Sequence, residues 1–189
     1  MIALHAAGTQ EALQKLSARF DFILVPGFKD SGPHHWQTLW QQQGPFFQRI
    51  TQKRWDVPDI ELWVSAIHRL LTLRGRPAVL IGHSLGALAS SCIAVDRNPL
   101  LAGVMLVAPA EPVRFEAEDL VPQHSLGLPS LVVASQDDPT MRFHRAEFWS
   151  GVWDAKLVDL GEAGHINAEA GFGPWPHGLD LLVEFAQAL

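Results

Sequence analysis

The stretch "VLIGHSLGALAS", residues 79–90, carries a serine in an apolar segment with a glycine two positions away on each side. The apolar residues before Ser84 are typical of a buried strand, and the small and apolar residues after it are typical of a helix. Strand and helix crowd together at such a turn, where Gly82 and Gly86 bring no Cβ atom to clash. The pattern G-x-S-x-G in this context predicts a nucleophile elbow at Ser84, and the alternative is a structural serine.

Short apolar runs bounded by Gly, Pro or Asp recur along the chain and predict strands that are covered on both faces. They lie at residues 20–27, 77–84, 101–110, 129–138 and 155–165, with a weaker, more exposed candidate at 49–55. Helical periodicity separates these runs, in patterns within residues 12–20, 36–40, 60–71, 85–95 and 179–189. Strands that alternate with helices predict an α/β fold, with a mainly parallel sheet and helices on both of its faces.

Three of the expected helices have start signals in the sequence. Thr9 can cap the first, Pro33 can open the second, and Asp56 or Asp59 can cap the third. No repeat, linker or shift of composition divides the 189 residues. The sequence therefore predicts a single domain over residues 1–189.

Composition argues against several classes of function. The net charge of −6 disfavours nucleic acid and anionic membranes as partners, because both select for basic patches. A single cysteine rules out a multi-cysteine zinc site, and the group Asp30, His34 and His35 lacks a second cluster to complete a metal site. We expect no metal and no other cofactor. No apolar run reaches the ~20 residues of a membrane span and no basic residues open a secretory signal, so the expected location is cytoplasmic.

Sites in parallel α/β sheets form beyond the carboxyl ends of the strands, which selects the residues after each apolar run. Besides Ser84, this rule selects Asp137, Asp138 and His165. A serine hydroxyl needs a base, and His165 is the best candidate among nine histidines because it follows the last strand. An acid must orient that base; spacing leaves Asp137 and Asp138 equally suited, with the other accepting backbone N–H groups. The order Ser, Asp, His is that of the α/β-hydrolase triad.

An oxyanion hole next to the serine would need two backbone N–H groups. One candidate is the N–H of Leu85, the residue directly after the proposed nucleophile. The second is the N–H of Phe28, in the loop after the first predicted strand. His83, inside the motif, is expected to support the turn without reacting.

Four stretches of the chain, in this order, resemble the small α/β-hydrolase-fold serine hydrolases related to the retinoblastoma-binding serine hydrolase and to bacterial YdeN-type proteins. They are "VPGFKDSGPHHWQ" (25–37), "GHSLGALA" (82–89), "ASQDDPTM" (134–141) and "GEAGHINAEAGFGPWPHG" (161–178). The resemblance implies a compact fold of about six parallel strands without a large lid domain. It implies a triad of Ser84, Asp138 and His165, and it places His35, Trp36 and Gln37 at the oxyanion loop and the substrate pocket.

On this basis we expect a serine hydrolase that cleaves a small-molecule ester or related acyl bond through an acyl-enzyme intermediate. Residues 166–178 would form a wall over the site, where Phe172 and Trp175 either cover the substrate or belong to the core. Residues 111–127 are the only stretch long enough for a small lid, which favours small substrates. The alternative is a binding or regulatory protein that retains the hydrolase fold.

The first 19 residues are a departure from the family pattern, in which the chain usually begins almost at the first strand. We expect residues 1–19 to form a helical extension. It would pack either on the edge of the sheet or on a second copy of the chain, and the latter arrangement would make a homodimer.

Overall fold

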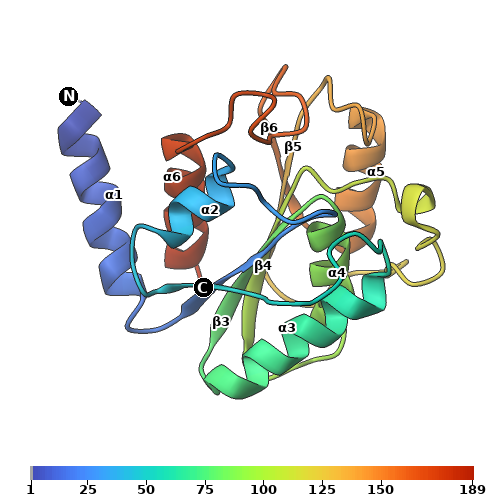
Figure 1. Ribbon diagram of the computed structural model, residues 1–189, viewed down its shortest axis with the longest axis horizontal. Coiled ribbons are helices and arrows are strands. Elements are labelled where there is room, and N and C mark those ends of the chain that lie inside the picture. The colour runs from blue at the N-terminus through green and yellow to red at the C-terminus, as the bar shows by residue number, and fades with distance from the viewer. Residues whose placement is uncertain (1) are drawn as a thin grey trace.

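The computed structural model describes the backbone of residues 2–189 and the side chains from residue 8 onward. Its centre is a six-stranded sheet in the order β2-β1-β3-β4-β5-β6, with every neighbouring pair parallel (Figure 1). The strands are β1 (Asp21–Val25), β2 (Phe47–Arg49), β3 (Ala78–His83), β4 (Leu101–Val107), β5 (Ser130–Ala134) and β6 (Lys156–Asp159). The predicted α/β class and parallel sheet are confirmed.

Helices cover both faces of this sheet (Figure 1). One face carries α3 (Ile60–Arg74), α4 (Leu85–Ala94) and α5 (Phe143–Trp153). The other carries α1 (Ile2–Leu16), α2 (Trp36–Gln41) and α6 (Pro176–Gln187). A short 3-10 helix, η1 (Pro112–Phe115), follows β4. Residues 2–189 contain no additional domain beside this three-layer arrangement.

The hydrophobic core consists of two clusters, one on each side of the sheet. Successive side chains of a strand point to opposite faces. Accordingly Phe22 and Leu24 of β1 join the cluster under α1, α2 and α6, whereas Ile23 and Val25 join the cluster under α3, α4 and α5. β1, β3 and β5 are buried along their whole length, which explains why they are continuous apolar runs instead of alternating ones. β6 lies at the edge of the sheet with Lys156 and Asp159 exposed, so the prediction that this strand is covered on both faces is wrong.

The edge strand β2 is the one predicted strand that is misplaced. The prediction was residues 49–55, but the strand spans Phe47–Arg49. The N–H of Ile50 still donates to the carbonyl of Leu24 at 3.2 Å, and the chain then leaves the sheet. Residues 51–54 are polar and have no apolar side chains to bury on either face, so the strand prediction for them is wrong.

Helix starts also differ from the sequence signals. Thr9 lies inside α1 and does not cap it. α2 begins three residues after Pro33, with His35 as its N-cap, so proline does not open this helix. Asp59, one of the two candidates, caps α3 through its side chain. Local cap signals are short, and packing of the helix decides which one is used.

No prediction covers α5, although the sequence contains a signal for it. The buried residues of this helix are Ala146, Trp149, Ser150 and Trp153. They follow the i, i+3, i+4, i+7 spacing of a helix that buries one face. The pattern is weak because a serine and two tryptophans occupy positions where aliphatic residues usually mark the buried face of a helix.

The N-terminal helix α1 stands beside α6 at one side of the molecule (Figure 1). Leu13 and Leu16 are buried in the core, and the hydroxyl of Thr9 donates to Asp180 Oδ1 at 2.7 Å. The helical extension predicted for residues 1–19 therefore packs against α6, while Met1 lies outside the described residues. Among the described residues, no helix combines the length and the apolar character needed to span a membrane.

Candidate active site

Ser84 occupies the turn between β3 and α4 in a strained backbone conformation. Its φ is 56° and its ψ is −121°, a region that residues other than glycine rarely adopt. It is the N-cap residue of α4, yet its side chain makes no capping hydrogen bond. The hydroxyl is therefore not used to stabilise the helix, which is what a nucleophile elbow requires.

The two glycines of the motif are required by close backbone approaches. A Cβ at Gly82 would lie 2.5 Å from the carbonyl oxygen of Gly86. A Cβ at Gly86 would overlap the carbonyl oxygens of Val25 and Pro26 at the end of β1. The missing side chains thus allow α4 to start directly against the sheet, and they hold Ser84 at its carboxyl edge.

Replacing Gly86 with alanine is expected to lower the free energy of unfolding by about 3 kcal/mol, because the new methyl group would overlap two backbone carbonyls. Urea unfolding measures this change. Gly151→Ala is the matched control: Gly151 is an exposed helical glycine at which a Cβ would meet no atom within 4 Å. That change should raise the free energy of unfolding by about 1 kcal/mol. Equal losses of unfolding free energy in both variants would contradict the conclusion that the backbone contacts at position 86 require glycine.

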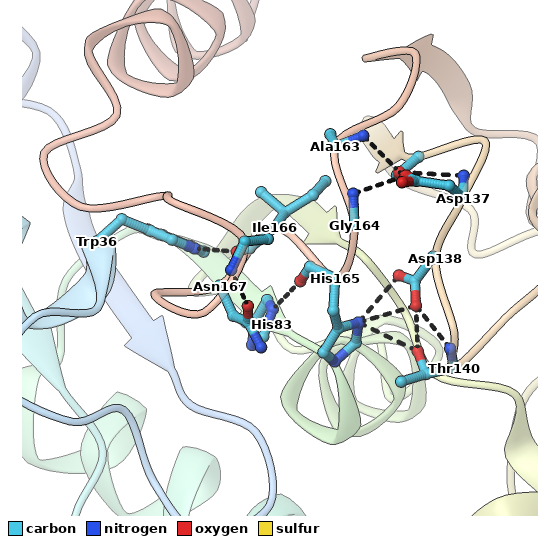
Figure 2. Close-up of polar contacts among 12 residues, drawn as sticks. Trp36, His83, Asp137, Asp138, Thr140, Ala163, Gly164, His165, Ile166 and Asn167 are labelled. Atoms are coloured by element: carbon cyan, nitrogen blue, oxygen red, sulfur yellow. Dashed lines mark hydrogen bonds and ion pairs between the residues drawn. The ribbon is translucent and has the colours of Figure 1, made fainter.

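His165 and Asp138 form a hydrogen-bonded pair beyond the ends of β6 and β5 (Figure 2). His165 Nδ1 lies 2.9 Å from Asp138 Oδ2 and 3.1 Å from Asp138 Oδ1. Thr140 donates to Asp138 Oδ1 from its backbone N–H at 2.7 Å and from its hydroxyl at 2.8 Å. The buried carboxylate thus accepts a hydrogen bond from the Nδ1–H of the imidazole, which leaves Nε2 as the basic nitrogen.

Asp137, the other candidate acid, faces the backbone of the loop between β6 and α6 that carries His165, here called the histidine loop (Figure 2). Its Oδ1 accepts from the Ser135 hydroxyl and from the Gly164 N–H, both at 2.7 Å. These hydrogen bonds, the one from Ser135 foremost, lower the pKa of Asp137. The two adjacent carboxylates therefore have different surroundings: Asp138 contacts the imidazole and Asp137 holds the loop that carries it.

Ser84 and His165 lie at the same edge of the sheet, and His83 connects their segments. The His83 ring is 4.8 Å from the His165 ring, centroid to centroid, and His83 Nε2 lies 2.9 Å from the His165 carbonyl oxygen. Because His83 directly precedes Ser84, the elbow and the histidine loop are in contact. Sequence reasoning expected His83 to support the elbow, but it missed this contact with the loop.

The two N–H groups expected to form an oxyanion hole are placed near the serine. Leu85 is the first residue of α4, where an N–H has no acceptor within the helix. Phe28 follows Gly27, at which a Cβ would lie 2.9 Å from Ser84 Cβ. Within the described residues, the Phe28 N–H has no hydrogen-bond partner, whereas its neighbour Lys29 donates to the Trp55 carbonyl.

The aromatic residues expected around a pocket lie mostly in the core. Trp36 is fully buried and Trp175 is 7% exposed, with their ring centroids 5.1 Å apart. Phe172 is partly buried against Trp175. The structure thus places Trp36 and Trp175 inside the cluster under α2 and α6 instead of on a pocket wall, because these large rings fill the space between helices and sheet.

His35 and His83 are buried histidines, and burial disfavours their protonated forms. Burial, followed by the nearby charges of Arg49 and His165, lowers the pKa of His35 to about 4. Burial also lowers the pKa of His83 well below its usual value. His35 Nδ1 accepts from the Gln37 N–H, so its proton sits on Nε2, which has no partner among the described residues.

Lowering the pH from 6.5 to 4 is expected to destabilise the protein through these histidines, because the unfolded chain takes up protons that the folded chain does not. For His35 alone the loss reaches roughly 3 kcal/mol at pH 4. Urea unfolding at several pH values measures it. His35→Asn keeps an N-cap acceptor but does not titrate, so this variant should lose less stability over the same interval. An identical pH dependence in both proteins would contradict the argument.

The alternative metal site is not assembled. Asp30 pairs with Arg49, and His34 is exposed whereas His35 is buried. Over the described part of the chain, no group of three or more His, Cys, Asp or Glu side chains could hold a metal ion.

A serine at a strand–helix elbow, with an aspartate–histidine pair at the same edge of a parallel sheet, defines the α/β-hydrolase class. Comparison with known families agrees. The chain belongs to the serine hydrolase family, whose model matches residues 22–184. The protein is therefore a hydrolase.

Solved structures show the same relationship. A YdeN-like hydrolase from Pectobacterium atrosepticum is 48% identical, with a TM-score of 0.93 over 96% of this chain and 98% of that chain. The ydeN gene product from B. subtilis is 21% identical, with a TM-score of 0.70 over 88% and 98%. Est1E from Butyrivibrio proteoclasticus, at 13% identity and a TM-score of 0.65 over 88% and 86%, shares the fold. No curated protein matches the chain.

Proposed function

We propose that the protein hydrolyses a small ester or related acyl bond through an acyl-enzyme intermediate on Ser84. Ser84 Oγ attacks the acyl carbon while its proton passes to His165 Nε2. The tetrahedral intermediate collapses, the bond to the alcohol breaks, and His165 returns the proton to the leaving alcohol. Water then attacks the acyl-serine with His165 as base, which releases the carboxylic acid and regenerates Ser84.

The hydrogen-bonded pair of His165 and Asp138 carries this proposal. A base can accept a proton at Nε2 only in the tautomer that holds the other proton at Nδ1, and Asp138 accepts a hydrogen bond from that Nδ1–H. The buried carboxylate also stabilises the imidazolium formed during each proton transfer. Asp138 is itself fixed by the two hydrogen bonds from Thr140. The sequence "DDPT" contains the aspartate-turn pattern that could have identified Thr140.

The oxyanion of the tetrahedral intermediate would be stabilised by the N–H groups of Leu85 and Phe28. Their support is the free N–H at the start of α4 and the close approach of Gly27 to Ser84. A donor of this kind is worth roughly 3–4 kcal/mol of barrier in related chemistry.

A small substrate is supported by the size of the segment that we expect to act as a lid, residues 111–127. Residues 111–127 contain only the 3-10 helix η1 and turns. Phe115 of η1 packs against Phe28, with ring centroids 6.2 Å apart, so this short segment lies next to the oxyanion loop. A cover of that length leaves little surface for a long acyl chain.

The test is a series of nitrophenyl esters of increasing acyl length, an anilide of the same acyl group, and labelling with a fluorophosphonate probe. We expect one label per chain, located by peptide mapping at Ser84, and faster turnover of acetate and butyrate than of palmitate. Faster cleavage of the anilide than of the matching ester would overturn the ester preference. A folded protein that is not labelled would overturn the acyl-enzyme proposal and would favour a binding or regulatory role.

A further inference from the structure

The backbone that carries His165 adopts an unusual conformation. Gly164 and Ile166, on either side of it, have φ values of 54° and 48°. A left-handed conformation is accessible to glycine but strained for a β-branched residue such as isoleucine. Strained backbone persists only where the surroundings fix it, and it is frequent at functional sites. The groups that hold residues 163–166, here called the histidine turn, therefore bear on how the imidazole is placed.

The N–H groups at the start of the histidine turn are held from the β5 side. Ser135 Oγ accepts from the Ala163 N–H at 2.9 Å, and Asp137 Oδ1 accepts from the Gly164 N–H at 2.7 Å. Both acceptors belong to the loop that also carries Asp138. These two hydrogen bonds thus fix the position of the His165 imidazole relative to Asp138.

Two consecutive carbonyls at the other end of the turn are held from the opposite side (Figure 2). His83 Nε2 lies 2.9 Å from the His165 carbonyl oxygen, and Trp36 Nε1 donates to the Ile166 carbonyl oxygen at 2.8 Å. Because a carbonyl oxygen can only accept, the proton of neutral His83 must sit on Nε2. One donor comes from the residue next to Ser84 and the other from α2, so neither belongs to the loop of Asp138.

We propose that His83 and Trp36 are positioning residues, which hold the main chain of His165 at a fixed place relative to Ser84. This inference rests on the proposed function of Ser84 and His165. Neither side chain needs to touch the substrate. His83 links the two proposed catalytic residues more directly than Trp36 does, because it contacts the His165 carbonyl and directly precedes Ser84 in the chain. Its neutrality also keeps a second positive charge away from the His165 imidazolium.

A purely structural role is the competing explanation, because Trp36 also packs in the core. Its ring lies 4.6 Å from that of Trp40, centroid to centroid, and both rings are fully buried. Trp40 offers a matched comparison: its Nε1 donates at 2.9 Å to the carbonyl of Pro174, which is not part of the histidine turn. Loss of the indole N–H should lower the free energy of unfolding by a similar amount at either position, but only the N–H of Trp36 contacts the histidine turn.

The experiment compares Trp36→Phe with Trp40→Phe, and His83→Leu with His83→Gln. We expect kcat for a short nitrophenyl ester to fall by about 10- to 100-fold in Trp36→Phe and His83→Leu with KM nearly unchanged, since small displacements of a base have effects of this size. Trp40→Phe should retain wild-type kcat. His83→Gln keeps an N–H donor at a similar reach and should recover most of the loss.

Urea unfolding and the rate of fluorophosphonate labelling accompany the kinetics. Similar midpoints for Trp36→Phe and Trp40→Phe, with slower labelling only in the first, would support positioning. Equal loss of kcat in both tryptophan variants, or wild-type kcat in His83→Leu, would overturn it. A wild-type protein that neither reacts with the probe nor turns over esters would instead refute the proposed function itself, so the two failures are distinguishable.

Discussion

Ser84→Ala is expected to lower kcat for a short nitrophenyl ester by about 10⁶-fold, the scale seen when a triad nucleophile is removed. Without the hydroxyl no acyl-serine can form, and the N–H groups of Leu85 and Phe28 can stabilise only direct attack by water. The measurement is steady-state turnover of the purified variant together with fluorophosphonate labelling, which should disappear. Appreciable turnover surviving in this variant would refute the nucleophile assignment.

Ser91→Ala is the matched control for this variant. Ser91 lies in α4, the helix that Ser84 precedes, and it is buried. Its hydroxyl donates to the carbonyl of Leu88 in the same helix at 2.7 Å. Removing that hydroxyl changes a local hydrogen bond but nothing at the elbow. We expect labelling and kcat close to wild type. If Ser91→Ala were as inactive as Ser84→Ala, the loss would reflect disruption of α4.

Asp138→Asn is expected to lower kcat by about 10⁴-fold while the protein stays folded. The asparagine amide can donate to His165 Nδ1, which would place the imidazole proton on Nε2, where it blocks acceptance of the Ser84 proton. Steady-state kinetics on the same ester measures the loss. The unfolding midpoint should change little, because the asparagine carbonyl can still accept from Thr140.

Asp137→Asn distinguishes the two adjacent acids. Asp137 Oδ1 accepts from the Gly164 N–H and from the Ser135 hydroxyl, and an asparagine carbonyl at the same place can retain both hydrogen bonds. We expect a loss of at most ~10²-fold, from a shifted imidazole and not from a wrong tautomer. A larger loss in Asp137→Asn than in Asp138→Asn would reverse the roles assigned to the two carboxylates.

The fold was predictable because buried parallel strands are continuous apolar runs. Four such runs coincide with β1, β3, β4 and β5, a fifth coincides with the half-buried edge strand β6, and the elbow at Ser84 follows from the glycines around it. The edge strand β2 was misplaced because an edge strand of three residues leaves only a weak pattern. Helix starts were predicted poorly where the choice depends on packing, as at Thr9 and Pro33.

Spacing in the sequence identified which strand ends carry the site residues. It could not identify which of two adjacent residues at a strand end takes part in the site. Asp137 and Asp138 are adjacent, so no spacing argument could tell which one faces the imidazole; the resemblance favoured Asp138, and the structure pairs it with His165. The contacts of His83 and Trp36 with the histidine turn join residues 82 and 130 positions apart. Such contacts follow from the order of strands in the sheet, which the sequence does not state.

The close approach of Gly86 to the end of β1 also bears on re-engineering. Val25 and Pro26 contact the first turn of α4, so the backbone at Ser84 and the loop after β1 support each other, and randomising either would disturb both. Two exposed side chains in and after η1, Val113 at 59% and Leu120 at 48%, take no part in this contact. A mutant library should therefore diversify Val113 and Leu120 and leave residues 82–86 untouched.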